Sequence, residues 1–234
     1  MKRIFGIFCL AALVFCACDN DKDNGKNDGP FTINPYDLVG VWACTDHIDP
    51  SGEHAPNVAS CTSMIVSIKD LTHYAPYYGS DNHKYEYESM KIDGDRLILD
   101  EGKETEMVIK VKDLDGKHLT WLQYPDSDDP IQESYINVTR IIPGKWKVNY
   151  PDGSTTATIE ANGSLVEEYQ TEEPFSLNCE WLLYISNGQV VLKINELVKD
   201  YIPWETEFIF LKVTDNRIEA RQSGTNAAIV LERQ

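Results

Sequence analysis

The chain has 234 residues, of which 42% are hydrophobic, and its formal net charge is −17. Such a length suits one or two domains, and the hydrophobic share is that of an ordinary globular protein with a core. The strong negative charge argues against nucleic acid as a partner and against contact with anionic lipid, and it favours solubility over an acidic binding face.

The N-terminus reads as a secretory signal. Lys2 and Arg3 form a basic start, and residues 4–15 form an uncharged apolar run too short to span a bilayer. Cys16, Ala17 and Cys18 follow. The stretch Phe15-Cys16-Ala17-Cys18 resembles the lipobox of bacterial lipoproteins, in which residues 1–17 would be the signal peptide. The resemblance implies that Cys18 becomes the acylated first residue of the mature chain, while a plain secreted protein cleaved nearby is the alternative.

Residues 18–36 read as an acidic, flexible tether. Asp19, Asp21 and Asp23 match the first ligands of a calcium loop, but Asn24 and Pro30 stand where that loop needs glycine and glutamate. The composition is too polar to bury a core. The acidic residues resemble the sorting signal of surface-exposed lipoproteins in Bacteroides-type bacteria, which implies an outer-membrane lipoprotein attached to the membrane through its lipid.

Three cysteines remain in the mature chain besides Cys18. Cys44 and Cys61 bracket a polar stretch, residues 45–60, that reads as a long loop. A disulfide between them, closing that loop, and two small buried side chains are both open interpretations. Cys179 is expected to be buried on a strand.

The remainder of the chain predicts an all-β protein. Short runs rich in Val, Ile, Thr and Tyr flank turn dipeptides at Asp93-Gly94, Asp115-Gly116, Asn187-Gly188 and Asp215-Asn216. These residues tolerate the positive φ that tight antiparallel hairpins need. No stretch carries a long helical stripe. The fold expected is two tandem antiparallel up-and-down meanders, each a barrel or half-barrel of about seven or eight strands.

The two halves share an order of motifs, which indicates a duplication with modules at residues 37–140 and 141–234. Each half opens on Gly-x-Trp, at Trp42 and Trp146, and each is expected to close on a short strand carrying an arginine, residues 136–141 with Arg140 and residues 229–234 with Arg233. These motifs resemble the lipocalin superfamily, and more closely the short lipocalin-like domains of Bacteroides lipoproteins. The resemblance implies that Arg140 packs over Trp42 and Arg233 over Trp146, which closes each barrel.

Little in the sequence points to catalysis. All five histidines lie in the first half without metal-ligand spacing, and surface positions are expected for them. Adjacent acids such as Glu167 and Glu168 are expected on a solvated rim, because neighbours on a strand face opposite ways. No nucleophile elbow or phosphate loop is present. We therefore expect no enzyme, no cofactor and no metal site.

The stretch "HYAPYYGSDNHKY" is the exception among the aromatic residues, because it is both loop-like and rich in tyrosine. The function expected is non-enzymatic binding of a small hydrophobic or glycan ligand in a barrel mouth. Residues 45–60 would lie over that mouth. The alternative is a structural or protein-interaction lipoprotein with filled barrels and no pocket; its protein partners are not indicated. The candidate ligand contacts are Tyr74, Tyr77, Tyr78 and Tyr85.

Overall fold

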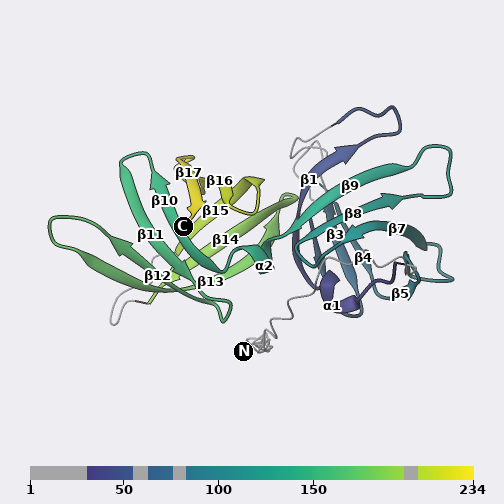
Figure 1. The fold of residues 1–234 in the computed structure, drawn as a ribbon, viewed down its shortest axis with the longest axis horizontal. Helices are drawn as coiled ribbons and strands as arrows, with labels where there is room; N and C mark the ends of the chain where they lie inside the picture. The colour runs from purple at the N-terminus through teal and green to yellow at the C-terminus, as the bar shows by residue number, and fades with distance from the viewer. Residues whose placement is uncertain (1–30, 55–62, 76–82, 198–204) are drawn as a thin grey trace, which may run out of the picture.

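The computed structural model describes residues 31–54, 63–75, 83–197 and 205–234. Its strands form two antiparallel sheets that follow one another along the chain, and Figure 1 shows them side by side. The prediction of an all-β protein with two tandem antiparallel meanders is confirmed. Within the described residues, no helix is long and apolar enough to cross a membrane.

The first module is a nine-stranded sheet that curls almost into a barrel. Its spatial order is β4-β3-β2-β1-β9-β8-β7-β6-β5, all antiparallel. The strands are β1 (Gly40–Ile48), β2 (Ser63–Val66), β3 (Leu71–Ala75), β4 (His83–Tyr87), β5 (Met90–Asp93), β6 (Arg96–Leu99), β7 (Met107–Leu114), β8 (His118–Gln123) and β9 (Ile131–Asn137).

The two edge strands of this sheet, β4 and β5, are consecutive in the chain and joined by Glu88 and Ser89. The buried carboxylate of Asp100 accepts the backbone N–H of Glu88 at 2.9 Å and that of Ser89 at 3.1 Å. Asp100 in turn donates its own N–H to the Ser89 carbonyl at 3.0 Å. The Asp100 side chain therefore binds the backbone N–H groups of the link between β4 and β5, two edge strands that do not pair with each other.

The second module is a closed barrel whose strands pair in sequence order, with β10 also pairing β17. Closure removes both sheet edges. The strands are β10 (Gly144–Tyr150), β11 (Gly153–Ile159), β12 (Ser164–Tyr169), β13 (Phe175–Ser186), β14 (Gln189–Glu196), β15 (Glu205–Val213), β16 (Arg217–Gln222) and β17 (Ala228–Arg233).

The predicted turn dipeptides all connect neighbouring strands. Asp93-Gly94 joins β5 to β6, Asp115-Gly116 joins β7 to β8, and Asn187-Gly188 joins β13 to β14. Asn187 and Gly188 both have positive φ, 51° and 72°. Two successive positive φ values match the right-handed twist of the flanking strands, so this hairpin closes with two residues.

Two one-turn helices precede the two Gly-x-Trp strands, α1 (Pro35–Leu38) and α2 (Val138–Ile141). The segment Ile136–Ile141 was expected to be a single closing strand. Only Ile136 and Asn137 belong to β9, and the rest forms α2. The chain turns here as it passes from β9 of the nine-stranded sheet to β10 of the closed barrel.

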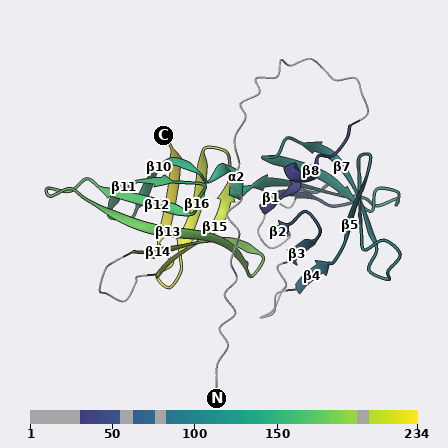
Figure 2. The ribbon, with the colours of Figure 1, turned by 90° about the horizontal axis from the view of Figure 1, so that it is seen from below.

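The two modules touch through buried apolar side chains. One hydrophobic cluster includes the buried residues of the second barrel. The same cluster also includes Val41 and Ala43 on β1, Ile136 on β9 and Ile141 on α2. These β1 residues alternate with Trp42, which faces the separate core of the first module. Figure 2 shows α2 lying between the two sheets.

Candidate functional site

A row of polar side chains crosses the inner face of the first module. His47 on β1 and Trp121 on β8 both pair with Glu133 on β9, so the three stand side by side on adjacent strands. Glu133 is 1% exposed, and Trp121 is fully buried. They lie toward the strand ends opposite Trp42, and we call this half of the module the distal half.

Glu133 is a buried carboxylate with several donors. His47 Nδ1 lies 3.1 Å from Oε1, while Trp121 Nε1 donates to Oε2 at 3.0 Å and Tyr135 Oη donates at 2.6 Å. The amide of Gln123 also donates to Oε2. Burial raises the pKa of Glu133, but the hydrogen bonds from His47, Tyr135 and Trp121 outweigh it, so the net pKa is lowered.

His73 on β3 lies beside this network and is 4% exposed. Its ring meets Trp121 edge-on at a centroid distance of 5.5 Å. Burial lowers the pKa of His73 to about 4, against a smaller opposing effect of the Glu133 charge, so the ring is neutral at pH 7. Within the described residues, His73 Nε2 has no hydrogen-bond partner. The expectation of surface histidines is wrong for His73, because alternation along β3 places it on the face of buried Leu71.

The structure does not bring the predicted tyrosine contacts together on one face. Tyr85 on β4 pairs with His73 and is 52% exposed. Tyr74 faces the other way and packs against the cluster shared with the second module. Tyr77 and Tyr78 lie outside the described residues.

The predicted loop over the barrel mouth is shorter than expected. Residues 45–48 continue β1 and pair with β9 across a bulge between Cys44 and Asp46. Cys44 Sγ donates to the Asp46 carbonyl at 3.4 Å. Cys61 and residues 55–60 lie outside the described residues, so the Cys44–Cys61 disulfide stays a prediction. The anchor residue Cys18 lies outside them as well.

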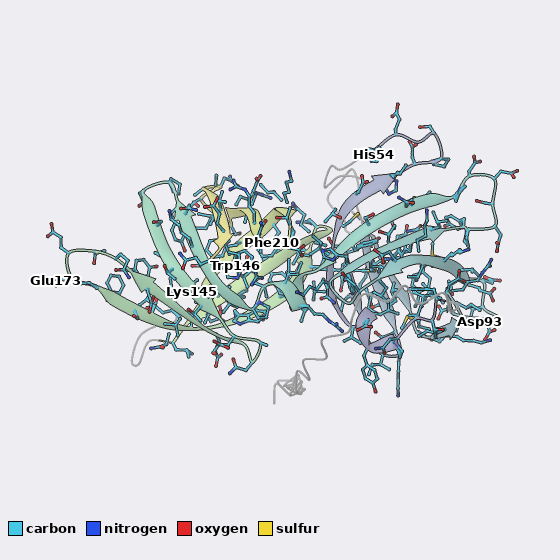
Figure 3. All side chains as sticks on the ribbon, in the orientation of Figure 1. His54, Asp93, Lys145, Trp146, Glu173 and Phe210 are labelled. Atoms are coloured by element: carbon cyan, nitrogen blue, oxygen red, sulfur yellow. The ribbon has the colours of Figure 1, made fainter. Side chains whose placement is uncertain are left out.

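Arg233 and Trp146 meet at the closed end of the second barrel. The guanidinium carbon lies 4.5 Å from the Trp146 ring centroid. Arg233 also donates to the carbonyls of Ile141, Pro143 and Asp215, which join three segments at one point. Figure 3 shows Trp146 inside the barrel with Phe210. Gly144, at φ 138°, is required here because a Cβ would collide with the Arg233 guanidinium.

The first module uses different side chains at the equivalent end. The residue paired with Trp42 is Asn137, as Arg233 is paired with Trp146. A Cβ on Gly40 would collide with the Asn137 amide. Arg140 sits on α2, where it donates to Asp37 Oδ1 at 3.3 Å and to the Tyr36 carbonyl. Arg140 therefore ties α1 to α2 rather than occupying the strand position expected for it over Trp42.

The interior of the second barrel is largely filled by side chains. A cavity of about 10 Å³ lies among Val148, Ala157, Phe208 and Glu167, which is room for about one water molecule. A second space of about 30 Å³ lies between the modules, against Cys44 and Gln189. Among the described residues, no group of histidine, cysteine and acidic side chains is arranged to hold a metal.

Comparisons with known proteins assign no family to the chain. No protein-family description matches the sequence, and no curated protein matches it. A crystal structure of a protein of unknown function from the DUF3598 family of Nostoc punctiforme is similar at 11% identity, covering 86% of this chain and 100% of that one with a TM-score of 0.28.

Proposed function

We propose that this chain is an outer-membrane lipoprotein, exposed at the cell surface, that binds a glycan or a small amphipathic ligand without catalysis. The ligand site is the distal half of the first module. The observation that carries the proposal is the buried His73 Nε2, which lacks a hydrogen-bond partner among the described residues beside the Trp121 ring. A buried polar atom left unpaired costs about 1–3 kcal/mol, so a ligand hydroxyl there would be favoured.

The surrounding side chains suit a sugar or a similar amphipathic molecule. Tyr85 and Tyr87 stand on the inner side of the sheet with the buried rings of His73 and Trp121 beside them, and the apolar faces of sugars stack on exposed rings such as that of Tyr85. Glu133 already accepts hydrogen bonds from several neighbours, so it fixes the orientation of Trp121 and His47 instead of serving as a free base. That arrangement supports binding rather than acid–base chemistry.

The test is a glycan and lipid binding screen on the full chain, followed by variants. His73→Phe keeps the ring contacts and removes the nitrogen, and Tyr85→Ala removes an exposed ring; both should weaken binding of any hit by about tenfold. Tyr36→Ala, which removes a 59% exposed ring from α1, serves as the matched control. Unchanged binding by His73→Phe would contradict the site.

The lipid anchor has its own experiment. A Cys18→Ala chain lacks the acylated residue and should move from the membrane fraction to the soluble fraction, since the acyl chains supply about 0.8 kcal/mol per buried CH₂. A Cys179→Ala chain, altered at a buried thiol of β13, should stay in the membrane fraction. Retention of Cys18→Ala in the membrane would refute the anchor.

The predicted disulfide is tested by mass spectrometry of alkylated chain with and without reductant. A Cys44–Cys61 bridge protects both thiols until reductant is added. Alkylation of both before reduction would remove the argument that the segment after β1 is pinned over the distal half.

A second function is favoured by the filled second barrel. A carrier of drug-sized ligands needs a cavity of roughly 300 Å³ or more. The space of about 10 Å³ inside the second barrel falls well below that. We therefore propose, as the alternative, a structural or protein-interaction role, which complete failure of the ligand screen would support.

A further inference from the structure

The second barrel encloses a carboxylate. Glu167 on β12 is 7% exposed and faces inward, in line with Leu165 and Tyr169. Its Oε1 accepts the hydroxyl of Tyr150 at 2.8 Å and that of Thr155 at 2.6 Å. The expectation of a solvated rim for this acid is wrong, because the pleat of β12 turns Glu167 into the barrel and its neighbour Glu168 away from it.

The donors to Glu167 are neutral hydroxyls. Among the described residues, no lysine, arginine or histidine forms an ion pair with Glu167, whereas the first module's Glu133 has His47. Burial raises the pKa of the neighbouring Cys179 thiol to about 11, and the charges of Glu167 and Glu196 raise it further, so a second carboxylate and a neutral thiol stand near Glu167. A buried charge without an opposite charge is costly, so the barrel interior favours a cation.

The space beside Glu167 is small and apolar. The cavity of about 10 Å³ is bounded by side chains that include Ala157, Ile194 and Phe208. Its volume admits a group about the size of one water molecule. A primary ammonium group has that size, and a trimethylammonium group is too large for it.

An aromatic pair stands near Glu167, where β12 ends and β13 begins. Tyr169 and Phe175 are cross-strand partners whose rings stack at 4.5 Å with an interplanar angle of 6°. Phe175 is 47% exposed, so this aromatic pair reaches solvent, and its partly buried partner Tyr169 follows Glu167 by two residues on the same face of β12. Figure 3 shows Glu173, between these strands, at the tip of the β12–β13 hairpin on the side away from the first module.

We propose that the second barrel binds the primary ammonium group of an amphipathic amine. The ammonium occupies the water-sized space and donates to Glu167, and the apolar body of the amine lies against Tyr169 and Phe175. This site is independent of the ligand site proposed for the first module, because it lies in the other sheet and uses other side chains.

Isothermal titration calorimetry of the full chain with three probes tests the site. The probes are phenethylamine, its neutral isostere 2-phenylethanol, and the N,N,N-trimethyl derivative of phenethylamine. A hydrogen bond to a charged group predicts that phenethylamine binds about ten- to a hundredfold tighter than the alcohol. The bulky trimethyl derivative should bind as weakly as the alcohol. Equal affinities for all three would overturn the proposal.

Variants separate the carboxylate from general negative charge. Glu167→Gln should remove the preference for the amine over the alcohol, while Glu168→Gln, altered at the outward-facing neighbour, should keep it. Ala157→Val fills the cavity and leaves Glu167 in place, so it should weaken phenethylamine binding even if Glu167→Gln fails to fold. An undiminished preference in Glu167→Gln or in Ala157→Val contradicts the site.

Backbone amide NMR locates the binding. Phenethylamine should shift the signals of Thr155, Glu167 and Tyr169 and leave those of His73 and Glu133 in place. Shifts confined to the first module would refute this proposal and leave the first proposal standing. A glycan that shifts only the first module would support the first proposal and say nothing against this one.

Discussion

At the scale of single residues, both modules place a glutamate inside the sheet and surround it with donors from neighbouring strands. Glu133 and Glu167 each sit in a strand whose alternating residues include buried Tyr135 or Leu165. The alternation of buried and exposed positions along each strand was the one sequence pattern that indicated their burial. It was outweighed by the general rule that glutamate is rarely buried, and that rule fails where several donors converge on one carboxylate.

His73 makes the free energy of unfolding decrease as the pH falls. Its pKa is about 4 in the folded chain against 6.5 for an ordinary histidine, so the unfolded state gains a proton first as the pH falls. The free energy of unfolding should therefore decrease between pH 6.5 and pH 4, by up to about 3 kcal/mol at 1.36 kcal/mol per pKa unit. Above pH 6.5 the contribution is constant.

The measurement is urea unfolding at pH 7 and pH 4.5. His73→Phe keeps the ring in place and should lose much of this pH dependence. His54→Gln, altered at an exposed histidine near the end of β1, should retain it. Parallel pH dependence in the wild-type chain and His73→Phe would show that His73 does not titrate as described.

Arg233 should matter more than an ordinary surface arginine. Arg233→Ala removes the contact with Trp146 and hydrogen bonds to three carbonyls, which predicts a loss of about 2–3 kcal/mol in the free energy of unfolding. Arg221→Ala, which removes one hydrogen bond to exposed Asn226, should cost under about 1 kcal/mol. Urea unfolding followed by tryptophan fluorescence compares them, and equal losses would contradict the structural role of Arg233.

At the scale of elements, the hairpins were predictable and the barrel ends were not. Turn dipeptides such as Asn187-Gly188 determine local φ and so mark each strand boundary. The Gly-x-Trp repeats marked where each module begins. The position of Arg140 was missed because α2 is one turn long, and no periodicity distinguishes four helical residues from the end of a strand. The carboxylate link at Asp100 depends on two segments brought together only by folding.

The link between β4 and β5 should depend on the Asp100 side chain. Asp100 has φ 51°, so Asp100→Gly keeps the backbone conformation accessible and removes only the carboxylate. The amides of Glu88 and Ser89 should then exchange with solvent faster, because both donate to Asp100. Amide hydrogen exchange measures this. Asp128→Gly, in the exposed β8–β9 turn, is the control, and unchanged exchange at Glu88 in Asp100→Gly would contradict the role.

At the scale of the whole molecule, the two modules form a continuous structure. Val41 and Ala43 alternate with Trp42, so one strand serves two cores on its two faces. This contact explains why the outer face of β1 is apolar in a chain with so much acidic surface. It also predicts that the modules unfold together.

A polar contact joins the same two modules at their turns. His118, at the start of β8, places Nδ1 2.9 Å from Asp115 Oδ2 and Nε2 3.0 Å from Asp215 Oδ1 of the second module. The hydrogen bond that His118 donates to the Asp115 carboxylate raises the pKa of His118, and the Asp215 charge adds to it. Cationic side chains near these turns come from three residues: Lys117 follows Asp115 by two positions, the Arg140 guanidinium lies against Gly116, and Arg233 donates to the Asp215 carbonyl.

The pH dependence that His118 gives to the stability has the opposite sign to that of His73. A raised pKa means that the contact stabilises the folded chain fully below pH 6.5 and that its contribution disappears as the pH rises through the folded pKa of His118. The side chain is 38% exposed, so solvent screening limits the effect to about 0.2–1 kcal/mol.

Urea unfolding at pH 6 and pH 8.5 in low salt should show this loss of stability in the wild-type chain and not in His118→Gln. Asp215→Asn should reduce it, and Asp152→Asn, in the β10–β11 turn, should leave it unchanged. Identical pH dependence in the wild-type chain and His118→Gln would mean that the apolar contact alone holds the modules together.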